Sequence, residues 1–283
     1  MAKLGYGTWG LGGLDYGPIT EEKALGLLKH ALKKNINFFD TAPLYGNGRA
    51  EKIIGKLFNT HDRKKIIIST KAGMLPHKGF DWKQDFSVSN ILEDLDNSLH
   101  RLNTSYIDIY LLHNPDLKLV DISKIIELSK KLKKLNLIKR FGISLRSPLD
   151  FNSIKKLEGI DALEFNFNLL DQRALDIKLF EKLFKNNIFS ICRTPLCFGF
   201  LTDKKLKKKN MSKNDHRKNY PIEQFRRWEE GMNYFKNFLK KDNYLKFALN
   251  FCLSHKFQYV IPGMMSTNDI DSNLIISKSK KNF

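Results

Sequence analysis

Short apolar segments alternate along this chain with longer segments whose apolar residues recur at helical spacing. The helical pattern is clear at Ala24, Leu27, Leu28 and Ala31, which follow the N-cap residue Thr20. The expected strands span residues 3–8, 36–40, 65–70, 106–112, 139–143, 162–165, 188–193 and 258–261. Eight parallel strands, each followed by a helix, predict an α/β fold whose sheet closes into a (β/α)8 TIM barrel.

The expected helices follow these strands in order. They span about 21–31, 49–58, 89–101, 122–135, 149–157, 175–183, 223–239, 244–254 and 267–276. A chain of 283 residues can bury one large core, so we expect a single domain over residues 1–283. The expected departure from the repeat is a basic excursion at about 202–220, after the seventh strand.

The charge of the chain raises the question of an anionic macromolecular partner. The sequence has 49 lysine and arginine residues against 30 aspartate and glutamate residues, a net charge of +19. The densest cluster runs from Lys204 to Lys218 and has no Phe, Trp or Tyr until Tyr220, whereas single-strand binding normally uses aromatic stacking. We therefore expect a solvated, mobile loop and no nucleic-acid partner, with a docking patch for an anion as the alternative.

Nothing in the sequence resembles a membrane span or a signal peptide. No run of about 18 apolar residues occurs, and residues 1–3 lead directly into the first expected strand. The three cysteines, Cys192, Cys197 and Cys252, include no CxxC pair, which favours reduced structural thiols over a disulfide or a zinc site. We expect a cytoplasmic protein with no metal site and no membrane partner.

Four titratable residues lie where expected strands end. Asp40 ends the second strand and Tyr45 follows it by five positions, while Lys71 and His113 follow the third and fourth strands. In a barrel such strand exits converge on the C-terminal face, where active sites form. Singly, Asp40 could cap a helix and His113 could be a core histidine bonded to backbone. Together, the four are the groups that one kind of proton transfer needs.

That proton transfer is the one that accompanies reduction of a carbonyl group. A free tyrosine, with a pKa of about 10, is a poor proton donor near neutral pH. A lysine cation such as Lys71 stabilises the phenolate of Tyr45, and Asp40 can hold that lysine charged and oriented. His113 can donate a hydrogen bond to the carbonyl oxygen. Side chains carry no hydride, so a nicotinamide cofactor is required.

Seven short motifs are spread over nearly the whole chain. They are GYGTW at 5–9, DTAPLYG at 40–46, STK at 69–71, LLH at 111–113, FGIS at 141–144, NLLD at 168–171 and IPG at 261–263. In this combination the sequence resembles the aldo-keto reductase family, in particular bacterial-type NAD(P)H-dependent oxidoreductases. The resemblance implies a barrel without a Gly-rich dinucleotide fingerprint and an extended dinucleotide across its mouth. It also implies a catalytic tetrad of Asp40, Tyr45, Lys71 and His113.

The cofactor contacts that the resemblance implies are less complete. Ser144 matches the family's serine after the fifth strand, but Leu145 replaces the asparagine that usually follows it. Glu164 stands where a glutamine commonly binds the nicotinamide carboxamide, and Asn273 matches the adenine-binding asparagine. The implied cofactor-binding residues are Thr8, Trp9, Asp40, Ser144, Glu164, Arg193, Leu196, Gly199, Gly263, Asp269 and Asn273.

The choice between NADPH and NADH depends on the residues near the 2′-phosphate. Gly263, Met265 and Asp269 occupy places where family members often have lysine or arginine. Asp269 would repel a 2′-phosphate but could accept a hydrogen bond from a ribose hydroxyl, which favours NADH. The net charge, with Lys204 and Lys205 as candidate cations, favours NADPH. We expect NADPH, with NADH as the alternative.

The expected function is therefore NAD(P)H-dependent reduction of an aldehyde or ketone, including sugar-like carbonyls, with Tyr45 as proton donor. The substrate is a small-molecule carbonyl, and the sequence assigns no oligomeric state. Two alternatives stay open: an NAD-dependent alcohol or aldose dehydrogenase, or a non-catalytic nucleotide-sensing subunit. The intact tetrad argues against the second, while the changes at Leu145, Met265 and Asp269 keep it open. The expected pocket walls are Trp9, Leu44, Tyr45, Trp82, Phe86 and His113.

Overall fold

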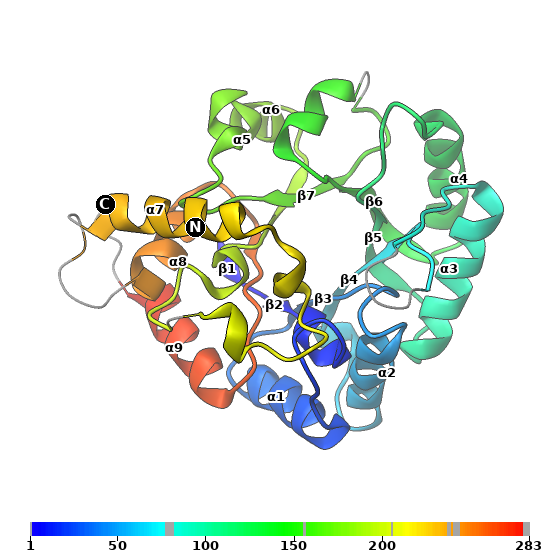
Figure 1. Cartoon of the computed structure of the whole chain (residues 1–283). Coiled ribbons are helices and arrows are strands. Elements are labelled where there is room, and N and C mark those ends of the chain that lie inside the picture. Colours follow the sequence, from blue (N-terminus) through cyan, green and yellow to red (C-terminus); the bar gives the residue numbers. More distant parts are fainter. Residues whose placement is uncertain are drawn as a thin grey trace.

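A ring of parallel strands forms the centre of the molecule, and helices surround it (Figure 1). The computed structural model describes residues 2–76, 82–154, 157–204, 206–236, 239 and 244–279. The strands are β1 (Lys3–Leu4), β2 (Tyr6–Gly7), β3 (Phe38–Asp40), β4 (Ile67–Ala72), β5 (Ile107–His113), β6 (Ile138–Ser144), β7 (Ala162–Asn166), β8 (Phe189–Arg193) and β9 (Tyr259–Val260). Their order is β1-β9-β8-β7-β6-β5-β4-β3-β2, so the predicted (β/α)8 barrel is confirmed.

The ring closes through the first predicted strand, which is divided at Gly5. The segment before Gly5, β1, pairs with β9, whereas the segment after it, β2, pairs with β3. A Cβ atom at Gly5 would lie 2.8 Å from Phe38 Cδ1 and 2.9 Å from Ile261 Cγ2. A side chain at this position would therefore push the first strand away from its neighbours.

The helices cover the outside of the ring, and side chains cap several of their N-termini, among them the predicted cap Thr20. Thr20 accepts from the backbone N–H of Lys23, and Ser87 from that of Asn90. The α-helices are α1 (Glu21–Lys33), α2 (Arg49–Gly55), α3 (Val88–Arg101), α4 (Ile122–Lys134), α5 (Arg173–Asp176), α6 (Leu179–Lys185), α7 (Ile222–Lys236), α8 (Tyr244–Ser254) and α9 (Thr267–Lys278). None of these described helices is long and apolar enough to cross a membrane.

Short 3-10 helices fill several connections. They are η1 (Trp9–Gly12), η2 (Lys56–Asn59), η3 (Arg63–Lys65), η4 (Pro148–Ser153), η5 (Cys197–Gly199), η6 (Lys208–Asn210) and η7 (His216–Asn219). Two helix predictions were wrong. The helix expected over 149–157 is the shorter 3-10 helix η4, which ends at Ser153 because the backbone of Ile154 is extended; residues 155 and 156 lie outside the described residues. The helix expected over 175–183 breaks at Lys178, which is left-handed with φ 51°.

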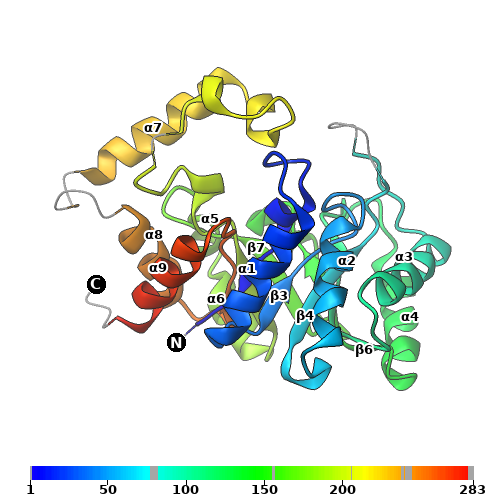
Figure 2. The same cartoon turned by 90° about the horizontal axis from the view of Figure 1, so that it is seen from below.

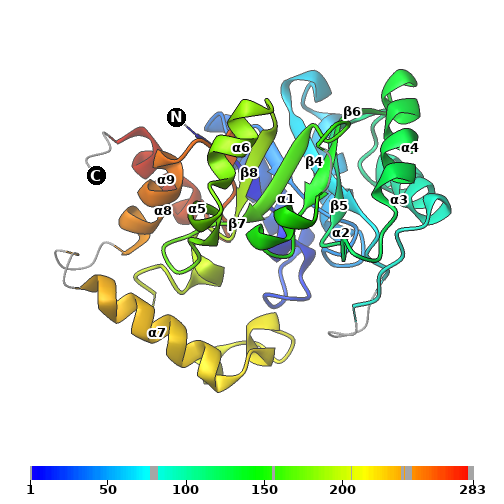
Figure 3. The same ribbon diagram turned by 90° about the horizontal axis from the view of Figure 1, so that it is seen from above.

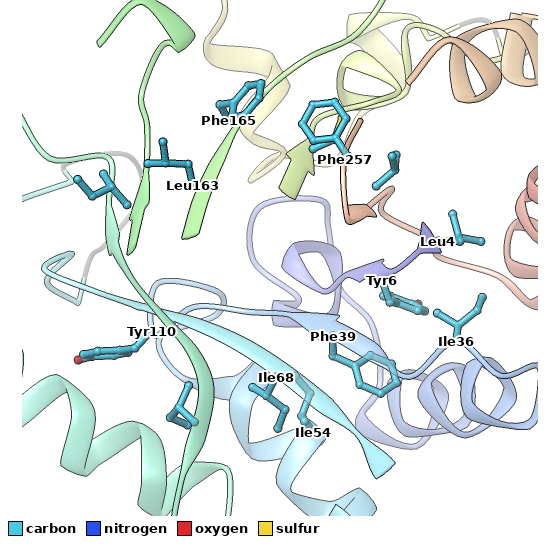
Figure 4. Packing of buried hydrophobic residues seen from close by; sticks show 14 of the residues in the cluster. Leu4, Tyr6, Ile36, Phe39, Ile54, Ile68, Tyr110, Leu163, Phe165 and Phe257 are labelled. Carbon is cyan, nitrogen blue, oxygen red and sulfur yellow. The ribbon is translucent and has the colours of Figure 1, made fainter. Parts of the chain in front are cut away.

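Two apolar layers follow from the alternation of side chains along the strands. On β3, Phe38 belongs to the cluster inside the ring, together with Leu111, Ile191 and Tyr259, while the next residue, Phe39, faces the helices. The outer cluster includes Leu4, Tyr6, Ile36, Phe39, Ile54, Ile68, Tyr110, Leu163, Phe165 and Phe257 (Figure 4). This double core fixes the strand ends that carry the polar residues of the mouth.

The segment between β8 and α8 forms a separate layer over one end of the barrel (Figures 2 and 3). It packs through its own cluster, which contains Phe200, Leu201, Met211, Phe225 and Trp228. The prediction of a solvated loop at 204–218 is therefore wrong in part: Lys204 and Lys207 are exposed, but Met211, Asp215 and His216 are buried. Lys205, the other proposed phosphate-binding lysine, lies outside the described residues.

Candidate active site

Three neighbouring strands bring Asp40, Lys71 and His113 together at the same end of the barrel. Asp40 is the last residue of β3, Lys71 lies at the end of β4, and His113 is the last residue of β5. The register pairs Asp40 with Ser69 and Lys71 with Leu111, so the three side chains leave the ring close to one another. Tyr45 reaches the same place from the turn after β3, where its backbone N–H bonds to the carbonyl of Ala42.

Lys71 is the centre of this group and is fully buried. Its Nζ lies 2.6 Å from Asp40 Oδ1, 3.0 Å from the carbonyl oxygen of Thr41 and 3.5 Å from the hydroxyl oxygen of Tyr45. The Tyr45 phenol is buried as well, with 9% of the residue exposed. A lysine held by a carboxylate thus lies within hydrogen-bond reach of the phenol.

The charges of the group follow from this burial. Burial lowers the pKa of Lys71, but the attraction of Asp40 and Glu164 outweighs it, so the pKa is raised and the ammonium form persists. Burial raises the pKa of Tyr45, against the opposing effect of Lys71, so the phenol keeps its proton. Burial and the neighbouring cations Lys71 and Arg193 hold the pKa of His113 well below its usual range, so its imidazole is neutral.

A second polar group lies on β6, β7 and β8, beside the first. Ser144 Oγ donates to Glu164 Oε1 at 2.8 Å, and Arg193 Nη1 donates to Ser144 Oγ at 3.0 Å. Arg193 also donates to the carbonyl of Leu145 at 2.6 Å and to Asn166 Oδ1 at 2.9 Å. Glu164 Oε2 connects the two groups because it lies 3.6 Å from Lys71 Nζ.

The other predicted cofactor residues line the mouth at different points. Thr8 Oγ1 donates to the carbonyl of Asp40 at 2.8 Å, and Gly263 bridges to Gly7 at the end of the first strand. Leu196 and Gly199 form the turn after β8, where the Gly199 N–H bonds to the Leu196 carbonyl at 2.8 Å.

The residues predicted to bind the adenosine part of the cofactor, Asp269 and Asn273, lie on α9. Asp269 Oδ2 accepts from the backbone N–H of Met265 at 3.0 Å, and its Oδ1 lies 3.0 Å from Lys204 Nζ. Asn273 is buried on the same helix, and its Oδ1 has no hydrogen-bond partner among the described residues. The Lys204 ion pair ties the exposed part of the β8–α8 segment to α9.

Trp9 covers the tetrad. Its ring stacks on that of Tyr45 at a centroid distance of 5.8 Å and an interplanar angle of 20°. Trp82 lies edge-on to Trp9 at 6.4 Å, and Leu44 shares a small buried cluster with Tyr45. Phe86, also predicted as a pocket wall, packs instead against Gly73 and the outer core.

Sequence reasoning missed His216, whose ring lies against that of Trp9 at a centroid distance of 4.3 Å. The backbone N–H of His216 donates to the carbonyl of Asp15 at 2.7 Å, and Asp15 Oδ2 accepts from Trp9 Nε1 at 2.7 Å. Burial lowers the pKa of His216 to about 3. The flanking Asp215 and Arg217, which form an ion pair at 2.6 Å, were the available signal, but the run of lysines concealed it.

Comparison with known proteins agrees with this geometry. The model of the Aldo/keto reductase family matches residues 3–282. The chain belongs to the aldo/keto reductase family. Aldo-keto reductase YhdN of Bacillus subtilis is 31% identical over 235 residues, which cover 81% of this chain and 69% of YhdN. L-galactose dehydrogenase of Arabidopsis thaliana is 30% identical over 213 residues, which cover 72% of this chain and 64% of that protein.

A solved structure supports the same assignment. The holo form of an aldo-keto reductase from Bacillus halodurans superposes with a TM-score of 0.79 at 27% sequence identity. The superposition covers 99% of this chain and 88% of that chain. The protein is therefore an oxidoreductase of the family that acts on carbonyl compounds with NAD(P)H.

The residues present fit a nicotinamide dinucleotide. Ser144 and Glu164 offer buried hydrogen-bonding groups beside Lys71, the half-buried Arg193 adds donors, and Asn273 offers a buried amide oxygen without a partner among the described residues. No set of three or more His, Cys, Asp or Glu side chains in the described part of the chain is arranged to hold a metal ion.

Proposed function

We propose that this aldo/keto reductase reduces an aldehyde or ketone to the alcohol, with Tyr45 as the proton donor and the substrate oxygen beside Tyr45 and His113. The observation that supports this role is the position of Lys71, buried between Asp40 at 2.6 Å and the Tyr45 hydroxyl at 3.5 Å. When bound, NAD(P)H supplies the hydride. The protein supplies the proton, the orientation and the exclusion of water.

Each residue of the tetrad has a distinct role in this proposal. Tyr45 enters the reaction protonated, because burial disfavours its phenolate. Lys71 stabilises the phenolate that forms when the proton leaves, and Asp40 keeps Lys71 charged and in place. His113 is neutral and donates a hydrogen bond to the carbonyl oxygen, which lowers the cost of negative charge on that oxygen.

Two groups of residues would hold the cofactor. Ser144, Glu164 and Arg193 lie beside the tetrad and would hold the nicotinamide carboxamide. Because an ionised Glu164 only accepts hydrogen bonds, it would bind the amino group of that carboxamide. Asn273 would bind the adenine, and Lys204 is the cation that we assign to the 2′-phosphate of NADPH, with NADH as the alternative.

The substrate class follows from the cover over Tyr45. Trp9, Leu44 and Trp82 are apolar or aromatic, while His113 and His216 add neutral imidazoles. Small carbonyl compounds that carry hydroxyl groups, such as aldoses, suit a wall of aromatic rings with a few hydrogen-bonding groups.

Substitution of Tyr45 by Phe tests the mechanism. We expect turnover of a panel of aldehydes, ketones and aldoses with NADPH to fall by about 10³-fold, because the ring remains but the proton donor is lost. The dissociation constant for NADPH, measured from quenching of tryptophan fluorescence, should change by less than about 2-fold, which corresponds to under about 0.5 kcal/mol. Undiminished turnover of the variant would remove Tyr45 from the mechanism.

A second candidate function is the reverse reaction, an NAD-dependent dehydrogenation of an alcohol or aldose. Asp269 favours it, because a carboxylate suits a ribose hydroxyl better than a phosphate, and a relative at 30% identity is named L-galactose dehydrogenase. Initial rates with aldose plus NAD and with aldehyde plus NADPH distinguish the two directions. Nucleotide binding without turnover in either direction would favour the non-catalytic alternative.

A further inference from the structure

Glu164 provides a second carboxyl group beside Lys71, in addition to Asp40. It lies on β7, on the side of Lys71 away from β3 in the strand order, and 1% of the residue is exposed. Glu164 Oε2 lies 3.6 Å from Lys71 Nζ, and Asp40 Oδ1 lies 2.6 Å from the same nitrogen. One buried ammonium group is therefore shared by two buried carboxyl groups.

The two carboxyl groups also interact with each other. Asp40 Oδ2 and Glu164 Oε2 are buried, and neither receives a hydrogen bond from a donor in the described ranges. Burial, and after it the charge of Glu164, raise the pKa of Asp40 well above its usual range. Burial acts on Glu164 too, but Lys71 and Arg193 outweigh it and lower the pKa of Glu164. Glu164 thus keeps its negative charge, and Asp40 is the member of the pair that takes up a proton first.

We propose that Glu164, as a second acidic partner of Lys71, keeps the Tyr45 phenol protonated over a wider pH range than a glutamine at this place would. The proposal rests on the role of Tyr45 as proton donor. Glu164 acts on the phenol by its charge, both directly and through its contact with Lys71. The consequence is an enzyme that works as a reductase far into the alkaline range and needs a high pH for oxidation.

The charge balance around the phenol supports this proposal. Lys71 and Arg193 contribute two positive charges, while Asp40 and Glu164 contribute two negative charges when both are ionised. A glutamine at 164 would leave one net positive charge, which would stabilise the phenolate. Burial has the largest effect on the pKa of Tyr45 and raises it. The charged groups that act on the phenol are Lys71 (β4), Asp40 (β3), Glu164 (β7) and Arg193 (β8). The neutral His113 (β5) lies at a ring-centroid distance of 6.1 Å.

The first test reads the phenol directly and does not depend on activity. 3-Fluorotyrosine, whose phenol is more acidic than that of tyrosine, is introduced at position 45, and its ¹⁹F resonance is followed against pH. We expect the apparent pKa to be lower by about one unit in Glu164→Gln than in the protein with Glu164. Glu181→Gln, the same change at an exposed site on α6, is the matched control and should leave it unchanged. Equal values in the protein with Glu164 and in Glu164→Gln would overturn the proposal.

The second test uses the pH dependence of carbonyl reduction. In Glu164→Gln the alkaline fall in kcat/KM should move to lower pH by the same amount as the apparent pKa of the fluorotyrosine. The rate of alcohol oxidation at neutral pH should increase. A higher KM for the cofactor with an unchanged alkaline limb would mean that Glu164 only binds nicotinamide, and would also overturn the proposal. If Glu164→Gln does not fold, Glu164→Leu removes the same charge at similar volume and should shift the limb in the same direction.

The two proposals fail separately. Active Tyr45→Phe would contradict the proposed mechanism whatever Glu164 does. If Tyr45→Phe is inactive and the apparent pKa of the fluorotyrosine is unchanged in Glu164→Gln, the proposed reductase function is supported and the proposed role of Glu164 is contradicted.

Discussion

The ammonium nitrogen of Lys71 lies 2.6 Å from Asp40 Oδ1, and neither side chain is more than 3% exposed. Ion pairs of this kind are costly to break, because the remaining partner is left charged and without water. Here the remaining partners would be two carboxyl groups, Asp40 and Glu164, since both face the same lysine. The pair therefore links the stability of the barrel mouth to its chemistry.

Replacement of Lys71 by Met should reduce both the stability of the protein and its catalytic activity. We expect turnover to be lost and the free energy of unfolding at pH 7.5 to fall by about 3–5 kcal/mol, because two buried carboxylates lose their cation. At pH 5 the loss should be smaller, since the stranded carboxyl groups can take up protons. Urea denaturation at the two pH values measures this difference.

Lys124→Met is the matched control for that experiment. The Lys124 side chain on α4 is 77% exposed, so its removal should change the unfolding free energy by less than about 0.5 kcal/mol. An equal loss of stability for Lys71→Met at pH 7.5 and pH 5 would contradict the explanation by buried charge.

The barrel could be predicted from the sequence because its signals are local. Short apolar segments alternate with segments of helical apolar spacing, and the predicted cap Thr20 marks where the first helix begins. The grouping of Asp40, Lys71 and His113 follows from the same logic, since parallel strands end on one face. The site residues that lie at strand ends were therefore within reach of sequence reasoning.

The part of the cover that comes from the segment after β8 could not be predicted in the same way. His216 lies against Trp9, although the two are far apart in sequence, and the contact depends on the path of a long connection after β8. The break at Lys178 is similar, because a left-handed lysine carries no sequence signal of its own. The pairing of Asp40 with Glu164 also depends on the size of the ring, which propensity does not encode.

The burial of His216 predicts a loss of stability in acid. Its pKa is lowered by burial to about 3, whereas an unfolded histidine has a pKa of about 6.5. The unfolded chain therefore binds a proton that the folded chain does not, so this contribution to stability is complete above about pH 6.5 and is lost as the pH falls toward 3. The expected slope is about 1.4 kcal/mol per pH unit within that window.

His216→Phe should reduce this acid sensitivity, because the ring that packs against Trp9 and Phe198 remains but cannot take up a proton. Urea unfolding at pH 7.5, 6.0 and 5.0 compares the variant with the parent protein. His100→Phe, at an exposed position in the last turn of α3, is the control. Parallel pH profiles for His216→Phe and the parent would show that His216 is not the group responsible.

Lys204 is expected to decide between NADPH and NADH. Its Nζ lies 3.0 Å from Asp269 Oδ1, while the other oxygen of Asp269 is held by the backbone N–H of Met265. In Lys204→Gln the 2′-phosphate would lose a cation and also meet the uncompensated charge of Asp269. We expect the dissociation constant for NADPH to rise by about 10-fold, and that for NADH by less than about 2-fold.

Titration of tryptophan fluorescence with each nucleotide measures both constants, and Lys207→Gln is the matched control. Lys207 is an exposed lysine of the same segment, so this variant changes the net charge equally without touching Asp269. If Lys204→Gln weakens both nucleotides to the same extent, the lysine interacts with the diphosphate or acts only through net charge. If the variant binds NADH more tightly and NADPH more weakly, Asp269 has become free to accept a hydrogen bond from the ribose hydroxyl. That result would favour dehydrogenation with NAD as the physiological direction.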